Sequence, residues 1–215
     1  MGKLLRLGRF VGFSSVVMLI AMASLSGCQL APTVTAHQFI RHQAIIDFAG
    51  LKEPITVDAL KTSIAVPVGW DPSGLRTGGL FSHQQWRSPS HANAVGVVYI
   101  KLPIPLPAST LAWFAKREYA KKSDDGRMIA EWTDALGRPW FEAENSRYHA
   151  RGCAMVRGTD AWILYYGFKR DRPPKPDELL LAARSLETIV PSDVRKQQER
   201  QQQRERAVAQ SDGAR

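Results

Sequence analysis

The sequence predicts an α+β fold in which helices pack on a mainly antiparallel sheet. Between residues 63 and 168, several short apolar segments are separated by tight turns, and short connections of this kind join antiparallel strands. Two segments, 93–102 and 161–168, are apolar on both faces, which is typical of central strands that are covered on two sides. Two stretches with helical spacing, one from Ser109 and one after Pro176, are expected to cover the sheet.

The first 27 residues have the layout of a secretion signal. Lys3, Arg6 and Arg9 give a basic start, and an apolar run from Phe10 to Ala23 follows. This run is shorter than the roughly 20 apolar residues that a transmembrane helix needs, and a short run behind basic residues is typical of a cleavable signal. We therefore expect residues 1–27 to be a signal peptide.

The residues that follow resemble the lipobox of bacterial lipoproteins, Leu25-Ser26-Gly27-Cys28. In lipoproteins, cleavage precedes the cysteine, its sulfur carries a diacylglycerol group, and the freed amine is acylated as well. Each buried methylene contributes about 0.8 kcal/mol, so several acyl chains anchor stably where one is marginal. The resemblance implies a chain held to a membrane by lipid on Cys28. Aspartate after the cysteine commonly signals inner-membrane retention, so Gln29 favours the outer membrane, facing the periplasm, in a cell with two membranes.

Residues 28–50 are expected to form the lipidated N-terminus and a linker. Residues 29–35 are polar, small and contain proline, which suits a linker. Residues 38–48 are more apolar, and we expect them to pack on the domain as a helix or a strand. Residues 51–190 are predicted to form a single domain, because about 140 residues can bury most of their apolar surface.

In the first half of this domain, residues 63–66 are predicted to form a strand that ends at Pro67, before a turn at residues 69–72. Residues 81–87 form a polar strand near an edge of the sheet, and residues 93–102 form a central strand. A proline-rich break follows, and Ser109 then caps a helix. One face of this helix carries the spaced side chains of Leu111, Phe114, Ala115, Glu118 and Tyr119.

The second half is predicted to hold three or four strands and a final helix. Met128, Ala130 and Trp132 alternate with polar residues, and a turn at 137–139 leads into a strand over residues 140–149. Residues 153–157 and 161–168 flank a compact hairpin turn. After the break at residues 173–176, the final helix has an apolar stripe made of Leu179, Leu180, Ala183, Leu186 and Ile189.

Residues 191–215 are predicted to be a disordered or transiently helical tail, since they are rich in Gln and Arg and almost lack apolar residues. Docking onto anionic lipid or cell-wall polymer is the alternative. Mixed charge weakens that alternative, because Glu199 and Glu205 offset the arginines.

The order of these elements resembles the PsbP-like fold family. The resemblance covers about residues 60–190 and depends on the segment 64–70, whose strand ends in a proline-glycine-tryptophan turn, on the helix from Ser109 and on the closing helix around residues 182–186. It implies an α/β/α sandwich. Members of the family generally act as binding or assembly factors without a common catalytic site, so the resemblance implies no site residue.

Composition limits the partners. The formal charge of +9 falls to +6 when Lys3, Arg6 and Arg9 leave with the signal, and the rest is spread over several segments. Export and the lack of one strong basic face make nucleic acid an unexpected partner.

The sequence offers no recognisable catalytic or metal-binding motif, so we expect no enzyme activity and no cofactor. Lipidation uses Cys28, which leaves Cys153 without an intramolecular disulfide partner, and we expect it to be buried on a strand. Glu142 and Glu144 are expected to share one strand face, and with Arg147 they would contact a ligand only if that face borders a groove. The five histidines show no ligand spacing, and we expect surface or hydrogen-bonded roles for His37, His42, His83, His91 and His149.

Trp70 and Trp86 are the two tryptophans predicted to form an exposed recognition patch, because they sit beside loops and polar residues. The expected function is that of a non-enzymatic, lipid-anchored envelope protein whose domain binds an envelope protein or a cell-wall partner. An envelope hydrolase with an unrecognised polar cleft and a small-molecule carrier with an aromatic-lined pocket remain as alternatives.

Overall fold

The computed structural model describes residue 42, residues 46–121 and residues 125–212. The predicted signal segment, Cys28 and most of the linker lie outside the described residues. Among the described helices, none has the length and apolar character needed to cross a membrane.

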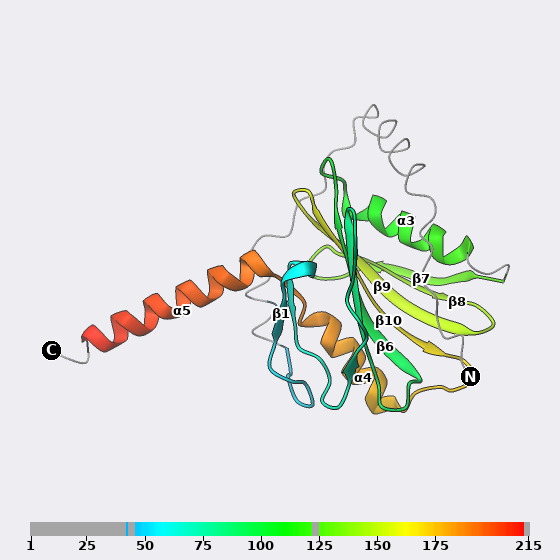
Figure 1. Ribbon diagram of the computed structural model, residues 1–215, viewed down its shortest axis with the longest axis horizontal. Coiled ribbons are helices and arrows are strands. Elements are labelled where there is room, and N and C mark those ends of the chain that lie inside the picture. Colours follow the sequence, from blue (N-terminus) through cyan, green and yellow to red (C-terminus); the bar gives the residue numbers. More distant parts are fainter. Residues whose placement is uncertain (1–41, 43–45, 122–124, 213–215) are drawn as a thin grey trace. The chain divides into compact units, whose positions relative to one another are not determined.

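An antiparallel sheet forms the centre of the domain (Figure 1). Its strands follow the order β3-β5-β6-β10-β9-β8-β7, and β4 also pairs with β5. The strands are β3 (Asp71–Pro72), β4 (Arg76–Gly78), β5 (Phe81–Arg87), β6 (Asn93–Lys101), β7 (Arg127–Thr133), β8 (Pro139–Glu144), β9 (Tyr148–Arg157) and β10 (Asp160–Lys169). Every pairing is antiparallel, which confirms the predicted α+β class.

The two strands with apolar faces are central, as predicted. β6 lies between β5 and β10, and β10 lies between β6 and β9. Val95, Val97 and Tyr99 of β6 point to one face of the sheet and are buried in the core. The polar strand β5 lies near the edge, where only the short strands β3 and β4 follow it.

The predicted strand over residues 140–149 is wrong, because a turn divides it. The Asn145 side-chain oxygen accepts the backbone N–H groups of Arg147 and Tyr148, at 2.9 and 2.7 Å. This side-chain turn ends β8 at Glu144 and starts β9 at Tyr148. His149 therefore belongs to β9, and β8 and β9 pair as neighbours.

One face of the large sheet is covered by helix α4 (Pro176–Glu187) and by a small sheet. The small sheet has the order β1-β2-β11, from β1 (Ile55–Val57), β2 (Thr62–Ile64) and β11 (Val190–Pro191), with a 3-10 turn η1 (Asp58–Leu60) between β1 and β2. Ala182 and Leu186 of α4 are fully buried in the same core as β6 and β10. Leu180, which we placed in the apolar stripe, is instead 51% exposed.

Trp70 and Trp86 belong to this core, so the predicted exposed patch is wrong. Each is only 2% exposed. Trp86 pairs across the strands with Val95, on the face that α4 and the small sheet cover. Their neighbours in the sequence are polar, but tertiary packing places both rings inside.

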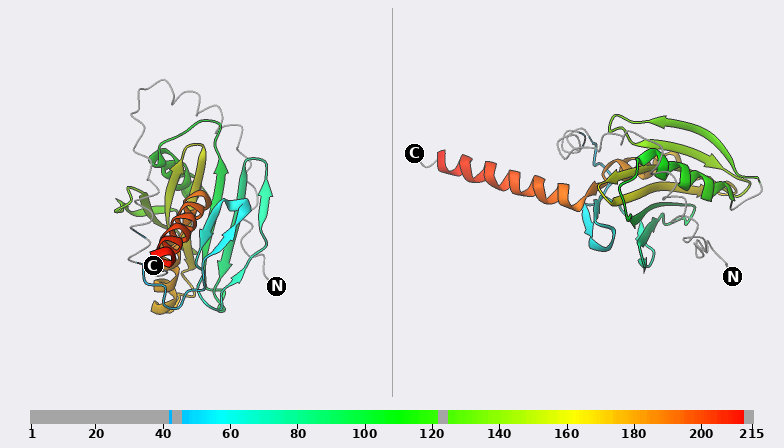
Figure 2. Two further views of the ribbon diagram at one scale, coloured as in Figure 1. Left: turned by 90° about the vertical axis from the view of Figure 1, so that its left-hand side faces the viewer. Right: turned by 90° about the horizontal axis from the view of Figure 1, so that it is seen from above.

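Helix α3 (Ala108–Lys121) covers the opposite face of the sheet, where it contacts β7 to β10 (Figures 1 and 2). Lys116 of α3 pairs with Glu131 at 2.7 Å, and Tyr119 donates a hydrogen bond to the Tyr148 carbonyl at 3.2 Å. Glu131 and Tyr148 point away from the face that holds Trp132 and His149, because successive strand residues alternate. The domain thus has helices on both faces of its sheet.

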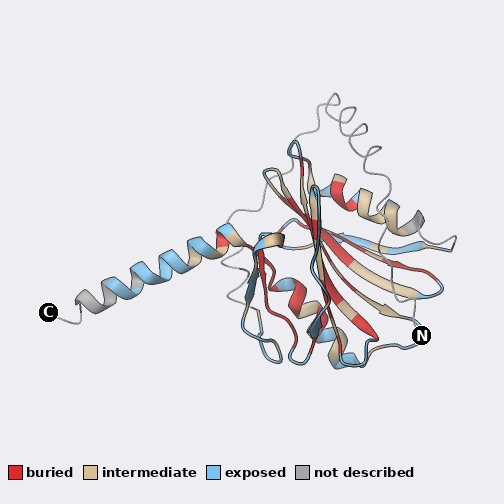
Figure 3. Ribbon diagram, viewed as in Figure 1, coloured by how far each residue is buried: buried red, intermediate tan, exposed pale blue. Residues whose placement is uncertain are grey.

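Helix α5 (Ser192–Asp212) occupies most of the segment that we predicted to be a disordered or transiently helical tail. Val194 in its first turn is buried in the core, whereas most of its later side chains are exposed (Figure 3). Gln, Arg and Glu are good helix formers, and Arg195 pairs with Glu199 one turn later at 3.0 Å.

Candidate functional site

A polar surface lies on β7, β8 and β9, on the same face of the sheet that α4 covers at β6 and β10. Five side chains define what we call the β7–β9 site: Trp132, Glu142, Glu144, His149 and Arg151. The β8–β9 register places Glu142 opposite Arg151 and Glu144 opposite His149. Cross-strand neighbours on one face have Cβ atoms about 5 Å apart, so Glu142 meets the opposite charge of Arg151 and Glu144 meets the His149 ring.

Glu142 links His149 to Arg151. His149 Nε2 lies 2.7 Å from Glu142 Oε1, and Arg151 Nη2 donates to Glu142 Oε2 at 2.9 Å. The His149 ring also stacks on Phe168, with ring centroids 4.7 Å apart. Glu142 and His149 are 16% and 17% exposed at their side chains, so the pair is shielded but reachable from solvent.

Glu144 forms the second negative centre of the site. Hydrogen bonding from Arg127 lowers the pKa of Glu144, and the charges of Arg170 and His149 lower it further. Arg170 Nη1 lies 3.8 Å from Glu144 Oε2, and His149 Nδ1 lies at the same distance from that oxygen. Both ring nitrogens of His149 therefore face carboxylates.

Arg151 connects the charged pairs to an aromatic cluster. Its guanidinium carbon lies 5.2 Å from the centroid of the Trp132 ring and 5.7 Å from that of Tyr166. Trp132 stacks on Trp140 with 5.7 Å between centroids and an interplanar angle of 9°. Trp132 remains 37% exposed, so an amphipathic ring is presented to solvent beside fixed charges.

Asp134 holds this aromatic cluster in place through a hydrogen bond to Trp140. Its Oδ2 accepts hydrogen bonds from Trp140 Nε1 at 2.8 Å and from Arg138 Nε at 2.7 Å, and its Oδ1 accepts the backbone N–H groups of Leu136 and Arg138. Burial raises the pKa of Asp134, but the Arg138 charge and these hydrogen bonds outweigh burial, so the net shift is downward. The orientation of Trp140, and hence of Trp132, is fixed by this carboxylate.

Most charged side chains of the site contact one another. Glu142 binds both His149 and Arg151, and each ring nitrogen of His149 has a carboxylate as its neighbour. Arg151 Nε, by contrast, is buried without a hydrogen-bond partner. Cys153 lies further along the same face of β9, but it is fully buried and burial raises the pKa of its thiol to about 12. Within the described part of the chain, no group of three or more His, Cys, Asp or Glu side chains could hold a metal ion.

The residues that the sequence singled out lie partly inside and partly outside the β7–β9 site. Glu142 and Glu144 share a face as predicted, whereas Arg147 lies in the turn between β8 and β9. Cys153 is buried on a strand, as predicted. His83 Nε2 lies 2.7 Å from the Tyr165 hydroxyl, on the opposite face of the sheet.

Sequence reasoning missed Trp132 and Arg151. The alternation of Met128, Ala130 and Trp132 suggested one apolar face, but the register shifts between Met128 and Ala130. Met128 therefore pairs with Ala143, whereas Trp132 pairs with Trp140 on the face of the site. A bulge of this kind leaves no clear signal in the sequence.

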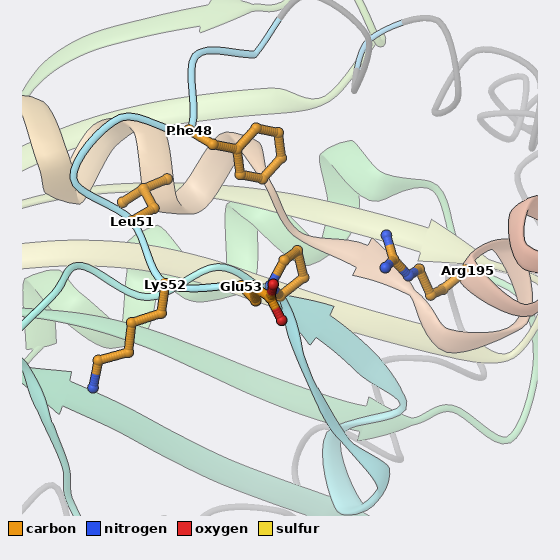
Figure 4. A pocket seen from close by; sticks show the side chains of 6 residues that line it. Phe48, Leu51, Lys52, Glu53 and Arg195 are labelled. Atoms are coloured by element: carbon orange, nitrogen blue, oxygen red, sulfur yellow. The ribbon is translucent and has the colours of Figure 1, made fainter.

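Away from this site, an open groove of about 360 Å³ lies beside the start of α5 (Figure 4). Its lining consists of Phe48, Leu51, Lys52, Glu53, Pro54 and Arg195. Three of these six side chains are charged, so the groove is not a dry aromatic cavity.

No protein-family model and no curated protein matches the sequence. A solved structure from Bacteroides thetaiotaomicron VPI-5482, determined at 1.50 Å resolution, is similar over 60% of this chain and 44% of that chain, with 11% sequence identity and a TM-score of 0.32. The similarity thus spans less than half of that protein's length, and it is too distant to assign a function.

Proposed function

We propose that the chain is a lipid-anchored bacterial envelope protein whose domain binds an envelope partner through the β7–β9 site, without catalysing a reaction. The observation that carries the binding role is the exposed Trp132 ring, which contacts both Trp140 and the Arg151 guanidinium. Tryptophan and arginine dominate the energetic hot spots of protein interfaces, particularly where neighbouring groups hold them in place. The resemblance to the PsbP-like fold family supports a binding or assembly role.

The lipid anchor is the first part of this proposal. Cleavage before Cys28 and acylation of that residue would place the domain on a membrane, and Gln29 favours the outer membrane facing the periplasm. Expression of the chain in a bacterium should yield a mature protein whose intact mass includes the acyl groups. The Cys28→Ser variant should lack that mass and leave the membrane fraction, and an unchanged mass and partition would contradict the anchor.

The binding site is tested by cross-linking in the native cells, followed by mass spectrometry of the captured material. We expect one reproducible partner, and we expect Trp132→Ala to weaken its binding by about 2 kcal/mol or more, roughly thirtyfold. Trp113→Ala is the matched control, since Trp113 on α3 is 44% exposed and also lies under an arginine, Arg117 at 5.2 Å. Equal losses in the two variants would contradict a role for the β7–β9 site.

An envelope hydrolase is the second candidate, favoured by the 2.7 Å contact between His149 and Glu142. A carboxylate in this position can orient an imidazole that acts as a general base. The second carboxylate, Glu144, faces the other ring nitrogen and weakens this candidate. Hydrolysis of an ester or amide substrate by the purified protein, abolished by His149→Phe, would favour the hydrolase over the binding protein.

A further inference from the structure

Helix α5 separates charges that are mixed in the sequence. Lys196, Arg200 and Arg204 follow one another at intervals of four residues, so they form a row along one side of the helix. All three are exposed. Among the described residues, no carboxylate lies within ion-pair distance of any of them.

The acidic residues of α5 do not neutralise this row. Glu199 pairs with Arg195, and Asp193 pairs with Arg157 of β9 at 3.0 Å. Residue 205 follows Arg204 by one position, and consecutive helical residues are about 100° apart, so it falls outside the row. The two carboxylates that argued against docking in the sequence therefore leave the row charged, because Glu199 is paired with Arg195 and residue 205 falls outside the row.

The row opposes helix stability, because like charges four residues apart repel one another. The buried Val194 attaches the first turn of α5 to the core, and the row begins two residues after it. The row therefore carries repelling positive charges and has no acidic partner among the described residues. An external anionic surface would neutralise these charges.

We propose that the Lys196–Arg200–Arg204 row docks on the anionic phospholipid headgroups of the membrane that holds the anchor. This inference rests on the proposed lipid anchor, which supplies the nearby surface. Ile46 lies eighteen positions after Cys28, so even a fully extended chain keeps the start of the domain within about 60 Å of the bilayer. Helix α5 is about 30 Å long, and its few apolar residues suit binding at the headgroups without insertion.

The test uses the membrane-purified protein, reconstituted in vesicles of phosphatidylcholine alone or mixed with phosphatidylglycerol. A fluorophore on Ala207→Cys, three residues after Arg204, reports contact with lipids that carry a nitroxide quencher on the headgroup. Quenching should rise with phosphatidylglycerol and fall with added salt. Each cation near an anionic surface contributes about fivefold, so Arg200→Gln/Arg204→Gln should lower the ratio of docked to free helix roughly thirtyfold.

The matched control is Arg195→Gln/Arg206→Gln, which removes the same charge from positions outside the row. We expect this pair to keep most of the quenching. Equal quenching in both vesicle types, equal effects of the two variant pairs, or binding of a soluble polyphosphate in place of vesicles would each overturn the proposal. The same quenching can be measured with unlipidated protein that is mixed with the same vesicles. The intact mass reports separately whether the anchor is present.

Discussion

At the scale of single residues, Asp134 gives the β7–β9 site its rigidity. Its two oxygens accept four hydrogen bonds, from Trp140 and from the loop that holds Arg138. Arg138 is only 2% exposed at its side chain, and its Nη1 has no hydrogen-bond partner. The guanidinium thus depends on Asp134 for the neutralisation of a buried charge.

Asp134→Asn should therefore destabilise the fold by about 3 kcal/mol, because removal of one partner leaves a buried charge uncompensated. The lowered folded-state pKa of Asp134 means that its stabilisation is present above the unfolded pKa of about 4 and is lost as the pH falls through the folded value. Urea unfolding should show a large difference between wild type and variant at neutral pH and a smaller one near pH 3. Asp58→Asn, at an exposed position, should change little, and a constant difference at every pH would contradict this account.

Gly96 is a second residue whose role is decided by its neighbour. A Cβ atom at this position of β6 would clash with Cζ of Tyr165, a half-buried ring that crosses it. Gly96→Ala should cost about 1–3 kcal/mol, because the ring must move out of a packed environment. Gly74→Ala meets open space and is the control for denaturant midpoints. Tyr165→Leu combined with Gly96→Ala should restore part of the loss, and an absence of any recovery would assign the cost to the strand backbone.

At the scale of elements, the sequence was a good guide to central strands and a poor one to strand ends. β6 and β10 are apolar on both faces, a pattern that depends only on alternation within each segment. The division of β8 from β9 depends on the Asn145 side chain, which bonds to two backbone N–H groups in a stretch that otherwise continues a polar strand pattern. The bulge in β7 likewise changes which face Trp132 occupies without changing the residues that flank it.

The connection between α4 and the small sheet depends on a few buried hydrogen bonds. Thr188 Oγ1 accepts the Ala65 backbone N–H at 2.9 Å and donates to the Ser185 carbonyl at 2.7 Å. Ser185 Oγ in turn donates to the Ala65 carbonyl at 2.7 Å. These contacts attach the end of α4 to the segment after β2. They therefore hold α4 and the small sheet together over the core.

Thr188→Val should weaken this connection by about 1–3 kcal/mol, because the shape is kept while the buried Ala65 N–H loses its acceptor. Thr56→Val makes the same chemical change on the exposed strand β1 and should stay within about 0.5 kcal/mol of wild type. Hydrogen exchange should locate the loss, with the Ala65 amide becoming less protected in Thr188→Val. Unchanged protection at Ala65 would show that the small sheet is held by apolar packing alone.

At the scale of the whole molecule, the class of the fold was predictable, whereas of the candidate site only the shared face of Glu142 and Glu144 was predicted. Trp70 and Trp86 sit beside turns in the sequence, and only the cover formed by α4 and the small sheet places them in the core. The site instead lies where the same face of the sheet continues beyond α4 to β7, β8 and β9. Glu142, His149 and Arg151 come together because β8 and β9 pair in this register. The spacing of these residues in the sequence does not predict it.

This arrangement also predicts that α5 contains two functionally separate parts. A chain that ends at Gln203 keeps Val194, which is fully buried, and the Arg157–Asp193 ion pair, so its thermal unfolding should stay close to that of the full chain. A chain that ends at Pro191 loses both and should be destabilised by about 2 kcal/mol, mainly through the lost burial of the valine. Because the shorter deletion removes Arg204 but leaves the core intact, it should weaken docking on anionic vesicles without lowering the unfolding temperature. If the chain ending at Gln203 were as unstable as the one ending at Pro191, the exposed part of α5 would belong to the folded core and would not be a separate docking element.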